Sequence, residues 1–147
     1  MSTIVVGVDG SKGSLAALEF AVAEARRREA EVKAVSAWRV PAAAYHSGWV
    51  PIPIQSSDFE DPARAVLERS IASLNGQVGN VKITPVVREG QAADVLTEEA
   101  RGADLLVVGS RGLGGFRGLL LGSVSQQCAH HTPCPIAIVP PPPENES

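Results

Sequence analysis

The sequence is poor in aromatic residues, which make up 4% of its 147 positions, and it has no excess of positive charge. Thirteen lysine and arginine residues stand against sixteen aspartate and glutamate residues, giving a formal net charge of −3. Binding to nucleic acid or to an anionic membrane usually needs a basic surface, and single-stranded nucleic acid also needs aromatic side chains for base stacking. The composition therefore argues against both kinds of partner.

Long apolar runs are also missing. The run Ile4-Val5-Val6 near the start is far shorter than the roughly 20 residues of a membrane-spanning helix, and no basic segment precedes it as in a signal peptide. We therefore expect a cytoplasmic protein without a membrane segment. A chain of this length forms one domain that buries roughly 68–70% of its unfolded surface.

Cysteine is scarce, and both copies lie near the C-terminus. Cys128 and Cys134 flank His130 and His131, which is a set of metal-ligating residue types without a common zinc spacing. The alternative is one buried helix cysteine and one loop cysteine, both as free thiols in a reducing compartment. We predict the second arrangement and no metal site.

Glycine, by contrast, is concentrated in one stretch. Residues 109–123 read GSRGLGGFRGLLLGS, with six glycines, two arginines and no carboxylate. An apolar strand precedes this stretch and a predicted helix follows it, so its backbone N–H groups and the helix start could hold an anion, most often a phosphate. The apolar residues 119–121 need burial, which argues against the alternative of a bare surface loop. Both readings remain open from the residues alone.

The glycine spacing excludes two common phosphate loops. The Walker pattern ends in Gly-Lys-Ser or Gly-Lys-Thr, whereas Leu121 precedes Gly122-Ser123 here and the loop contains no lysine. The dinucleotide fingerprint G-x-G-x-x-G is also absent after the strand, because Gly109 and Gly112 are separated by two residues.

Strand and helix patterns alternate along the chain. We predict strands over residues 3–8, 32–38, 81–87, 105–108 and 135–139. A first helix capped by Ser11 or Ser14 ends near residue 28, a second opens at Asp61-Pro62, a third ends at residue 100, and a fourth covers 123–131. Val124, Cys128 and His131 are expected to face inward in the fourth helix. This order predicts a single-domain, Rossmann-like α/β fold with an open five-stranded parallel sheet and helices on both faces.

Ligands of such sheets bind beyond the carboxyl ends of the strands, where the strand order reverses. Asp9-Gly10 and Gly109 both follow strands directly. If the first and fourth strands are neighbours, their two loops share one cleft.

Two segments lack a regular pattern. Residues 39–58 contain three prolines and scattered aromatic residues, and they could fold as a lid over a ligand, pack at an interface or stay disordered. The proline-rich, acidic residues 140–147 are predicted to form a disordered tail behind a domain of residues 1–139.

Several motifs together resemble one protein family. The glycine spacing G-2x-G-9x-G-S, formed by Gly109, Gly112, Gly122 and Ser123, is similar to the signature of the ATP-binding branch of the universal stress protein family. The resemblance extends to the opening IVVGVDGS of residues 4–11 and to the closing CPIAIV of residues 134–139. It implies a strand order of 3-2-1-4-5 and a homodimer that pairs through the last strand, Ile136–Val139.

The resemblance also implies a binding site for ATP, with Mg²⁺ expected to accompany it. Asp9 matches the acidic residue of the nucleotide pocket, with Val8 and Gly10 as neighbours, and Ala37 matches the adenine contact. Gly109 and Gly112 match the ribose and phosphate side, while the phosphate cradle matches Gly122, Ser123, Val124 and Ser125. From the residues alone, Asp9 could instead be a helix cap or turn residue. Arg111 and Arg117 could contact phosphate or be solvated loop charges.

No set of catalytic residues is recognisable. Asp9 is the one carboxylate expected near the phosphates, and no loop lysine is present to neutralise a transferring phosphoryl group. We therefore expect a nucleotide-dependent sensor or regulator of a stress response. The alternatives are a slow ATPase or nucleotidyl-transfer enzyme and a dimeric scaffold that binds no nucleotide.

Overall fold

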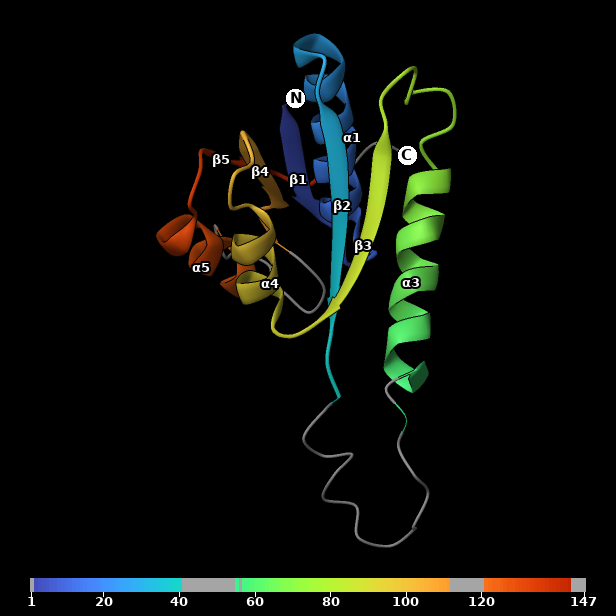
Figure 1. Ribbon diagram of the computed structural model, residues 1–147, viewed down its shortest axis with the longest axis vertical. Helices are drawn as coiled ribbons and strands as arrows, with labels where there is room; N and C mark the ends of the chain where they lie inside the picture. The colour runs from blue at the N-terminus through green and yellow to red at the C-terminus, as the bar shows by residue number, and fades with distance from the viewer. Residues whose placement is uncertain (1, 41–54, 56, 112–120, 144–147) are drawn as a thin grey trace, which may run out of the picture.

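The computed structural model describes residues 2–40, 55, 57–111 and 121–143, which form one parallel sheet flanked by helices (Figure 1). The strands lie in the order β3-β2-β1-β4-β5, which confirms the predicted fold class and strand order. The elements follow one another as β1 (Thr3–Gly7), α1 (Lys12–Arg28), β2 (Glu31–Trp38), α3 (Ser57–Ala72), β3 (Ile83–Glu89), α4 (Ala92–Glu99), β4 (Leu105–Gly109), α5 (Ser123–His131) and β5 (Ile136–Val139).

Two apolar layers hold this sheet between its helices. Residues of α1 and α3, such as Leu18 and Leu67, pack with Ile4 and Val6 on one face. Residues of α4 and α5, such as Leu96 and Cys128, pack on the other face. The central strands β1 and β4 are almost fully buried because helices cover both of their faces, which explains their uninterrupted runs of valine, isoleucine and leucine.

The two edge strands differ from these central strands. β3 is an edge strand, and it contains Pro85 in register with Ala34 of β2. An edge position accommodates proline because one side of the strand needs no ladder hydrogen bond. β5 is the opposite edge, and all four of its residues are half-buried.

The structure corrects the predicted start of α3. This helix begins at Ser57 rather than at Asp61-Pro62, so Pro62 lies inside the helix. The Asp58 carboxylate accepts a hydrogen bond from the backbone N–H of Gln55 at 3.3 Å, as an acidic residue of a capping box does. That local contact lets the helix begin earlier, and Pro62 is tolerated close to its first turn.

A second correction concerns the inward face of α5. Cys128 is fully buried as predicted, but Val124 is 37% exposed and His131 is also exposed. Ser125 is the other buried residue of this helix. Ser125 and Cys128 are three residues apart and define the inward stripe. Val124 lies at the margin of this stripe, about 40° from Cys128 and about 100° from Ser125, and His131 is the last residue of the helix.

The predicted lid, residues 39–58, lies mostly outside the described residues, as do the last four residues of the predicted tail. Within the described part of the chain, no helix is long and apolar enough to cross a membrane.

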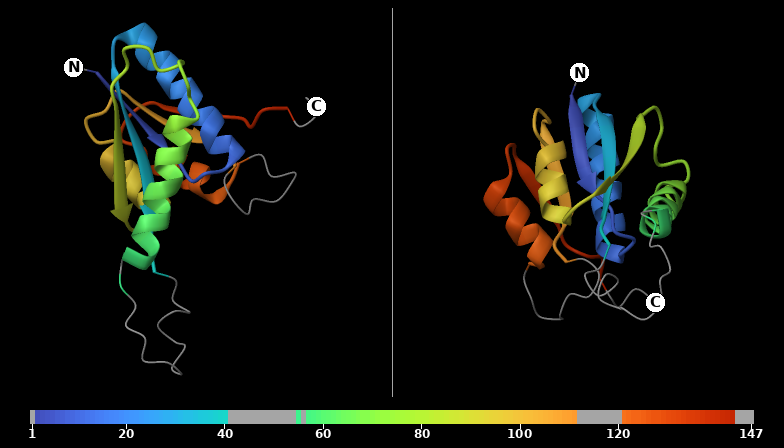
Figure 2. Two further views of the ribbon diagram at one scale, coloured as in Figure 1. Left: turned by 90° about the vertical axis from the view of Figure 1, so that its right-hand side faces the viewer. Right: turned by 60° about the horizontal axis from the view of Figure 1, so that its bottom comes forward.

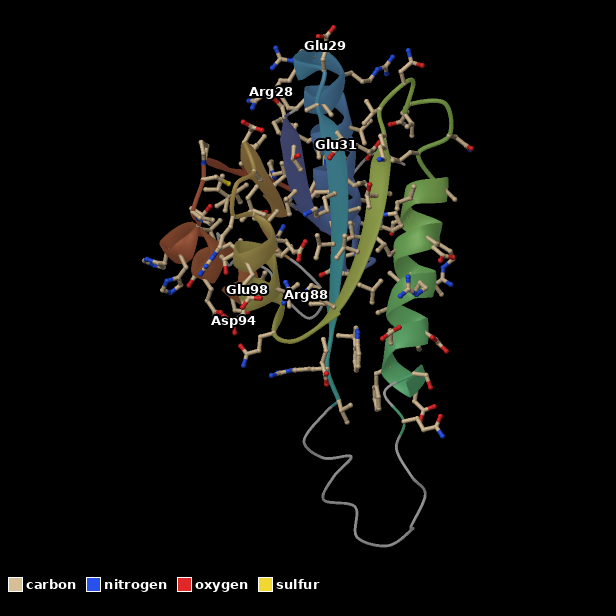
Figure 3. All side chains as sticks on the ribbon, in the orientation of Figure 1. Arg28, Glu29, Glu31, Arg88, Asp94 and Glu98 are labelled. Carbon is tan, nitrogen blue, oxygen red and sulfur yellow. The ribbon has the colours of Figure 1, made fainter. Side chains whose placement is uncertain are left out.

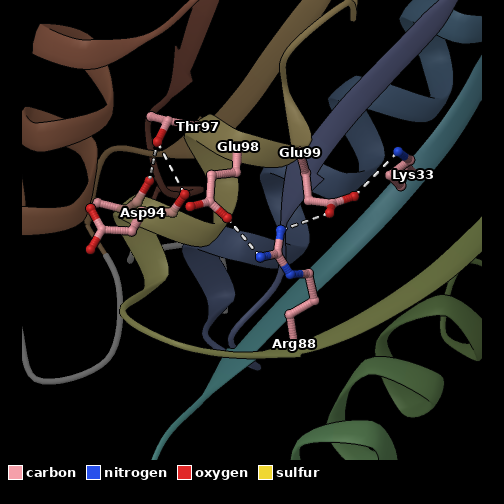
Figure 4. Close-up of polar contacts among 7 residues, drawn as sticks. Lys33, Arg88, Asp94, Thr97, Glu98 and Glu99 are labelled. Carbon is pink, nitrogen blue, oxygen red and sulfur yellow. Dashed lines mark hydrogen bonds and ion pairs between the residues drawn. The ribbon is translucent and has the colours of Figure 1, made fainter.

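Four charged side chains tie β2 and β3 to α4 (Figures 3 and 4). The Arg88 guanidinium donates to Glu98 at 2.6 Å and to Glu99 at 2.9 Å. Lys33 Nζ lies 3.2 Å from the other oxygen of Glu99. Burial alone raises the pKa of Glu99, but the hydrogen bonds from Arg88 and Lys33 outweigh it and hold the pKa below its ordinary value of 4.5.

Replacing Arg88 by glutamine is expected to lower the free energy of unfolding by about 1 kcal/mol at pH 7. A lowered carboxyl pKa stabilises the fold fully above its unfolded value of 4.5, and this contribution disappears as the pH falls through the folded value. The difference between wild type and variant should therefore shrink in urea titrations below pH 4.5. Arg64→Gln, which removes an exposed pair with Glu60, is the matched control and should change little.

Candidate functional site

The turn between β1 and α1 is held by short-range hydrogen bonds. The Asp9 side chain accepts from the backbone N–H of Ser11 at 2.9 Å, and the backbone N–H of Asp9 donates to the hydroxyl of Ser14 at 3.2 Å. Ser11 is the N-cap of α1, because its hydroxyl accepts from the N–H of Ser14 at 3.1 Å. Asp9 therefore serves as a turn residue, and it is exposed at the carboxyl edge of the sheet.

This turn lies directly against the carboxyl end of β4. A β-carbon added to Gly13 would lie 2.6 Å from the backbone oxygen of Arg111, and one added to Gly109 would lie 2.9 Å from the backbone oxygen of Gly13. Both distances are too short for a carbon atom, so the two backbones touch only because glycine stands at both positions. The predicted juxtaposition of the first loop with the start of the glycine stretch is confirmed.

The carbonyl of Ser110 joins the end of β4 to the start of α5. It accepts from the backbone N–H of Gly122 at 2.6 Å and from the hydroxyl of Ser125 at 2.9 Å. The N–H of Ser110 donates in turn to Val139 of β5 at 2.8 Å. Ser125 is 1% exposed, so its hydroxyl fixes the entry into α5, and a phosphate role for that hydroxyl stays a prediction.

The first turn of α5 faces the same edge of the sheet. Gly122 is the N-cap, and the N–H of Gln126 donates to its carbonyl at 3.0 Å, which closes the first turn. The N–H groups of Ser123, Val124 and Ser125 precede the first intrahelical donor, and the helix dipole places partial positive charge there. The first turn contains no acidic residue, and Ser123 and Val124 are exposed. This helix start is suited to an anion.

The remaining predicted site residues lie near this edge or outside the described part. Val8 is buried, and its N–H donates to Val35 at 2.8 Å, which continues the sheet beyond β1. Ala37 lies half-buried near the carboxyl end of β2, beside β1. Gly112 lies outside the described residues, as does Arg117. The right-hand view in Figure 2 brings this edge of the sheet toward the reader.

Sequence reasoning missed several residues that shape the site. Gly13, Ser14 and Ser110 make the contacts described above, yet each looks ordinary in the sequence. Trp38, at the end of β2, is 9% exposed, and its indole Nε1–H has no hydrogen-bond partner among the residues that the structure describes. The sequence did contain a signal for Trp38, a tryptophan at the end of a predicted strand. A buried indole N–H normally has a hydrogen-bond acceptor, so such a tryptophan is a candidate site residue.

The cysteines occupy the predicted positions, Cys128 buried within α5 and Cys134 half-buried before β5, and both are free thiols. Burial raises the pKa of the Cys128 thiol to about 11, so it stays protonated at neutral pH and is unsuited to nucleophilic chemistry. Among the residues that the structure describes, no three histidine, cysteine, aspartate or glutamate side chains lie close enough to hold a metal ion.

Sequence comparison connects the chain to one family. Residues 1–140 match the sequence model of the Universal stress protein family. A universal stress protein of Mycolicibacterium smegmatis is 37% identical over 140 residues, covering 94% of this chain. The universal stress protein Rv2623 of Mycobacterium tuberculosis is 36% identical over 135 residues, covering 92%. These matches cover 45% and 44% of the relatives, so the chain spans about half the length of the curated relatives it matches.

Solved structures with the same fold include two that are described with a nucleotide. A universal stress protein in complex with cAMP aligns with a TM-score of 0.74 and 27% identity, over 96% of this chain and 98% of that one. A universal stress protein family protein of Arabidopsis thaliana with AMP bound aligns with a TM-score of 0.65 and 21% identity, over 100% and 97% of the two chains. The second likeness supports the shared fold.

Proposed function

Because the chain belongs to the universal stress protein family, we propose that it binds an adenine nucleotide at the carboxyl edge of its sheet, with ATP as the preferred ligand. Residues 1–139 form the nucleotide-binding domain in this proposal. Bound nucleotide acts as a signal that alters the binding of a partner protein during a stress response. The similar structure described in complex with cAMP supports an adenine ligand.

The start of α5 is the observation that carries the proposal. Its exposed first turn offers N–H donors and the positive end of a helix dipole, without a carboxylate in that turn. The Ser110 carbonyl fixes this turn against β4 through Gly122 and Ser125. The donors are therefore oriented before a ligand arrives, which reduces the entropy lost on binding.

The roles of the other residues follow from their places along the edge. Gly122, Ser123, Val124 and Ser125 would hold the phosphates through the backbone. Gly109 and Gly112 would approach the ribose and phosphate side, and Ala37 the adenine. Asp9, with Val8 and Gly10 beside it, would accept hydrogen bonds from the nucleoside, since a carboxylate next to polyphosphate would repel it. Mg²⁺ would accompany the phosphates of ATP.

Three further parts of the proposal are open to direct measurement. The chain forms a homodimer through the free edge of β5 (Ile136–Val139), and a monomer in sedimentation equilibrium at micromolar concentration would contradict this. Its place is the cytoplasm, which fractionation of the native cell tests. Hydrolysis of ATP is at most slow, and sustained turnover that disappears in an Asp9→Ala/Gly122→Ala chain would favour the enzyme alternative.

Identification of the co-purified ligand tests the central proposal first. The protein is purified without added nucleotide and denatured, and the released molecules are separated by chromatography and weighed. ATP near one per chain is the expected result, ADP or AMP would favour the enzyme alternative, and cAMP would redefine the ligand.

A melting assay extends this test to protein that emerges empty. ATP at a hundredfold excess over its Kd should stabilise the fold by about 2.7 kcal/mol and raise the Tm by about 5–10 °C. Tripolyphosphate and adenosine are the controls, because each carries only one part of ATP, the phosphates or the nucleoside. The absence of any shift with millimolar ATP, AMP and cAMP would favour the scaffold alternative.

A further inference from the structure

A groove lies between α1 and α3 and shares Gly10 with the candidate nucleotide site. Figure 2 shows these two helices on one face of the sheet. The volume of the groove is about 270 Å³, slightly below the roughly 300 Å³ at which pockets for larger ligands begin. Lys12 comes from the first turn of α1 and Arg69 from the last turn of α3, and no aspartate or glutamate is among the described residues that line the groove. Neither cation forms an ion pair with another residue in the described part of the chain.

Serine hydroxyls supply further donors along the same walls. Ser11, Ser70 and Ser73 line the groove, and Ser73 donates to the carbonyl of Ser70 at 2.7 Å. The Ser11 hydroxyl accepts from the N–H of Ser14, so its own hydrogen is available to a ligand. Leu15 and Val66 form the apolar part of the lining. A small anion with several acceptor oxygens matches this combination of two cations and hydroxyl donors.

The face of the sheet that α1 and α3 cover carries another donor, on Trp38, the last residue of β2. Trp38 shares the α1/α3 face with Val32 and Ala34, because side chains alternate along β2. Its buried Nε1–H has no acceptor within the described part of the chain. A buried donor without a partner costs about 1–3 kcal/mol, which a ligand or a bound water can recover.

Two acidic residues adjoin lining residues in the chain, Asp9 before Gly10 and Glu68 before Arg69, and neither lines the groove. The Asp9 side chain accepts a hydrogen bond from the N–H of Ser11, so it is oriented by the turn. On α3, the Glu60 carboxylate is paired with Arg64 at 3.4 Å. The charged side chains among the lining residues are both cationic, in a chain whose formal net charge is −3.

We infer that the groove between α1 and α3 is a second anion site, which takes a phosphate or diphosphate group between Lys12 and Arg69. Gly10 and Ser11 line the groove and also belong to the turn beside the nucleotide site. The phosphate can thus belong to the nucleotide itself or to a separate phosphorylated metabolite. Both sources present the same chemistry to the groove.

Inorganic pyrophosphate is the probe, measured by isothermal titration calorimetry on the full chain. The Gly122→Val variant is the background, because it blocks the start of α5 and leaves the groove unchanged. We expect saturable binding there, weakened about tenfold or more by Lys12→Gln/Arg69→Gln. Lys82→Gln/Arg101→Gln removes the same charge at exposed positions away from the groove and should leave the affinity within about twofold.

A Trp49→Phe substitution leaves Trp38 as the one tryptophan of the chain, so its emission reports on the face of the sheet that α1 and α3 cover. Pyrophosphate should change this emission, and the change should disappear in Lys12→Gln/Arg69→Gln. Binding that survives this double substitution, or that weakens equally in the control pair, would overturn the inference. Loss of pyrophosphate binding in the Gly122→Val variant, without any change at Lys12 or Arg69, would also overturn the inference. That result would place the anion at the start of α5 and would not contradict the proposed nucleotide function.

Two competition experiments distinguish a phosphate of the nucleotide from a separate phosphorylated metabolite. If pyrophosphate binds equally well to AMP-saturated protein, the groove takes a separate phosphorylated ligand. If pyrophosphate instead competes with ATP, and Lys12→Gln/Arg69→Gln weakens ATP more than AMP, the groove receives the terminal phosphates of the nucleotide.

Discussion

Replacing Gly122 by valine is expected to lower nucleotide affinity by about a hundredfold or more while the fold survives, because the branched side chain would stand before the first turn of α5. The backbone of Gly122 has φ −77° and ψ 171°, an extended conformation that valine adopts readily. Its N–H bond to Ser110 and its carbonyl bond to Gln126 involve the backbone, so both persist in the variant. Calorimetry with ATP measures the loss, and far-UV circular dichroism checks the fold.

Gly76→Val is the matched control for this variant. Gly76 lies in the turn after α3, at the opposite edge of the sheet, and its φ of +69° makes valine unfavourable there. This control should lower the Tm and leave the affinity for nucleotide unchanged. If Gly122→Val retains its affinity for ATP, the start of α5 is not part of the binding site. If Gly122→Val fails to fold, Gly122 is needed for packing of the domain.

Replacing Gly13 by alanine is expected to lower the free energy of unfolding by about 2–3 kcal/mol. Alanine usually stabilises a helix interior by up to about 1 kcal/mol relative to glycine, so an ordinary helical position would give the opposite sign. Here the new methyl group would lie 2.6 Å from the backbone oxygen of Arg111, and a backbone cannot rotate away as a flexible side chain does. Urea titration monitored by circular dichroism measures the change.

Two further variants show whether this contact is the cause. A methyl group on Gly109 would meet the backbone oxygen of Gly13 at 2.9 Å, so the two substitutions act on one contact. The double variant should lose less than the sum of the single losses, because the first methyl group already separates the backbones. Gly102→Ala, with φ +80° and no atom within 4 Å of the new methyl group, measures backbone strain alone. A Gly13→Ala chain as stable as the wild type would contradict the predicted contact.

The fold was largely predictable because its signals are local and repeated. The alternation of strands and helices predicted a parallel sheet, and the glycine spacing, through the family resemblance, predicted the order β3-β2-β1-β4-β5 that the structure has. Boundaries were less accurate where a single contact decided them. The bond from Gln55 to Asp58 moved the start of α3 ahead of Pro62, and such a bond leaves no periodic trace in the sequence.

The site was predictable in part, for a related reason. Asp9, Gly109 and Gly122 stand out because a loop after a buried strand and a glycine before a helix are visible in the sequence. Ser125 looked like one more hydroxyl at a helix start, but the structure turns it inward onto Ser110. The direction of a side chain depends on the residues that pack around it, and the Ser125 hydroxyl bonds to Ser110, which follows β4 rather than belonging to α5.

The sequence by itself determined the class of fold, the edge of the sheet at which we propose that a nucleotide binds, and the anion-compatible start of α5. These features arise from strand periodicity, glycine placement and helix ends, which involve residues close together in the chain. Only the tertiary structure decided that Gly13 touches Arg111, that Arg88 joins two strands to α4, and that Lys12 and Arg69 face one groove. Each of these contacts joins residues from separate elements, so it exists only once the parallel strands have been ordered and the helices packed on them.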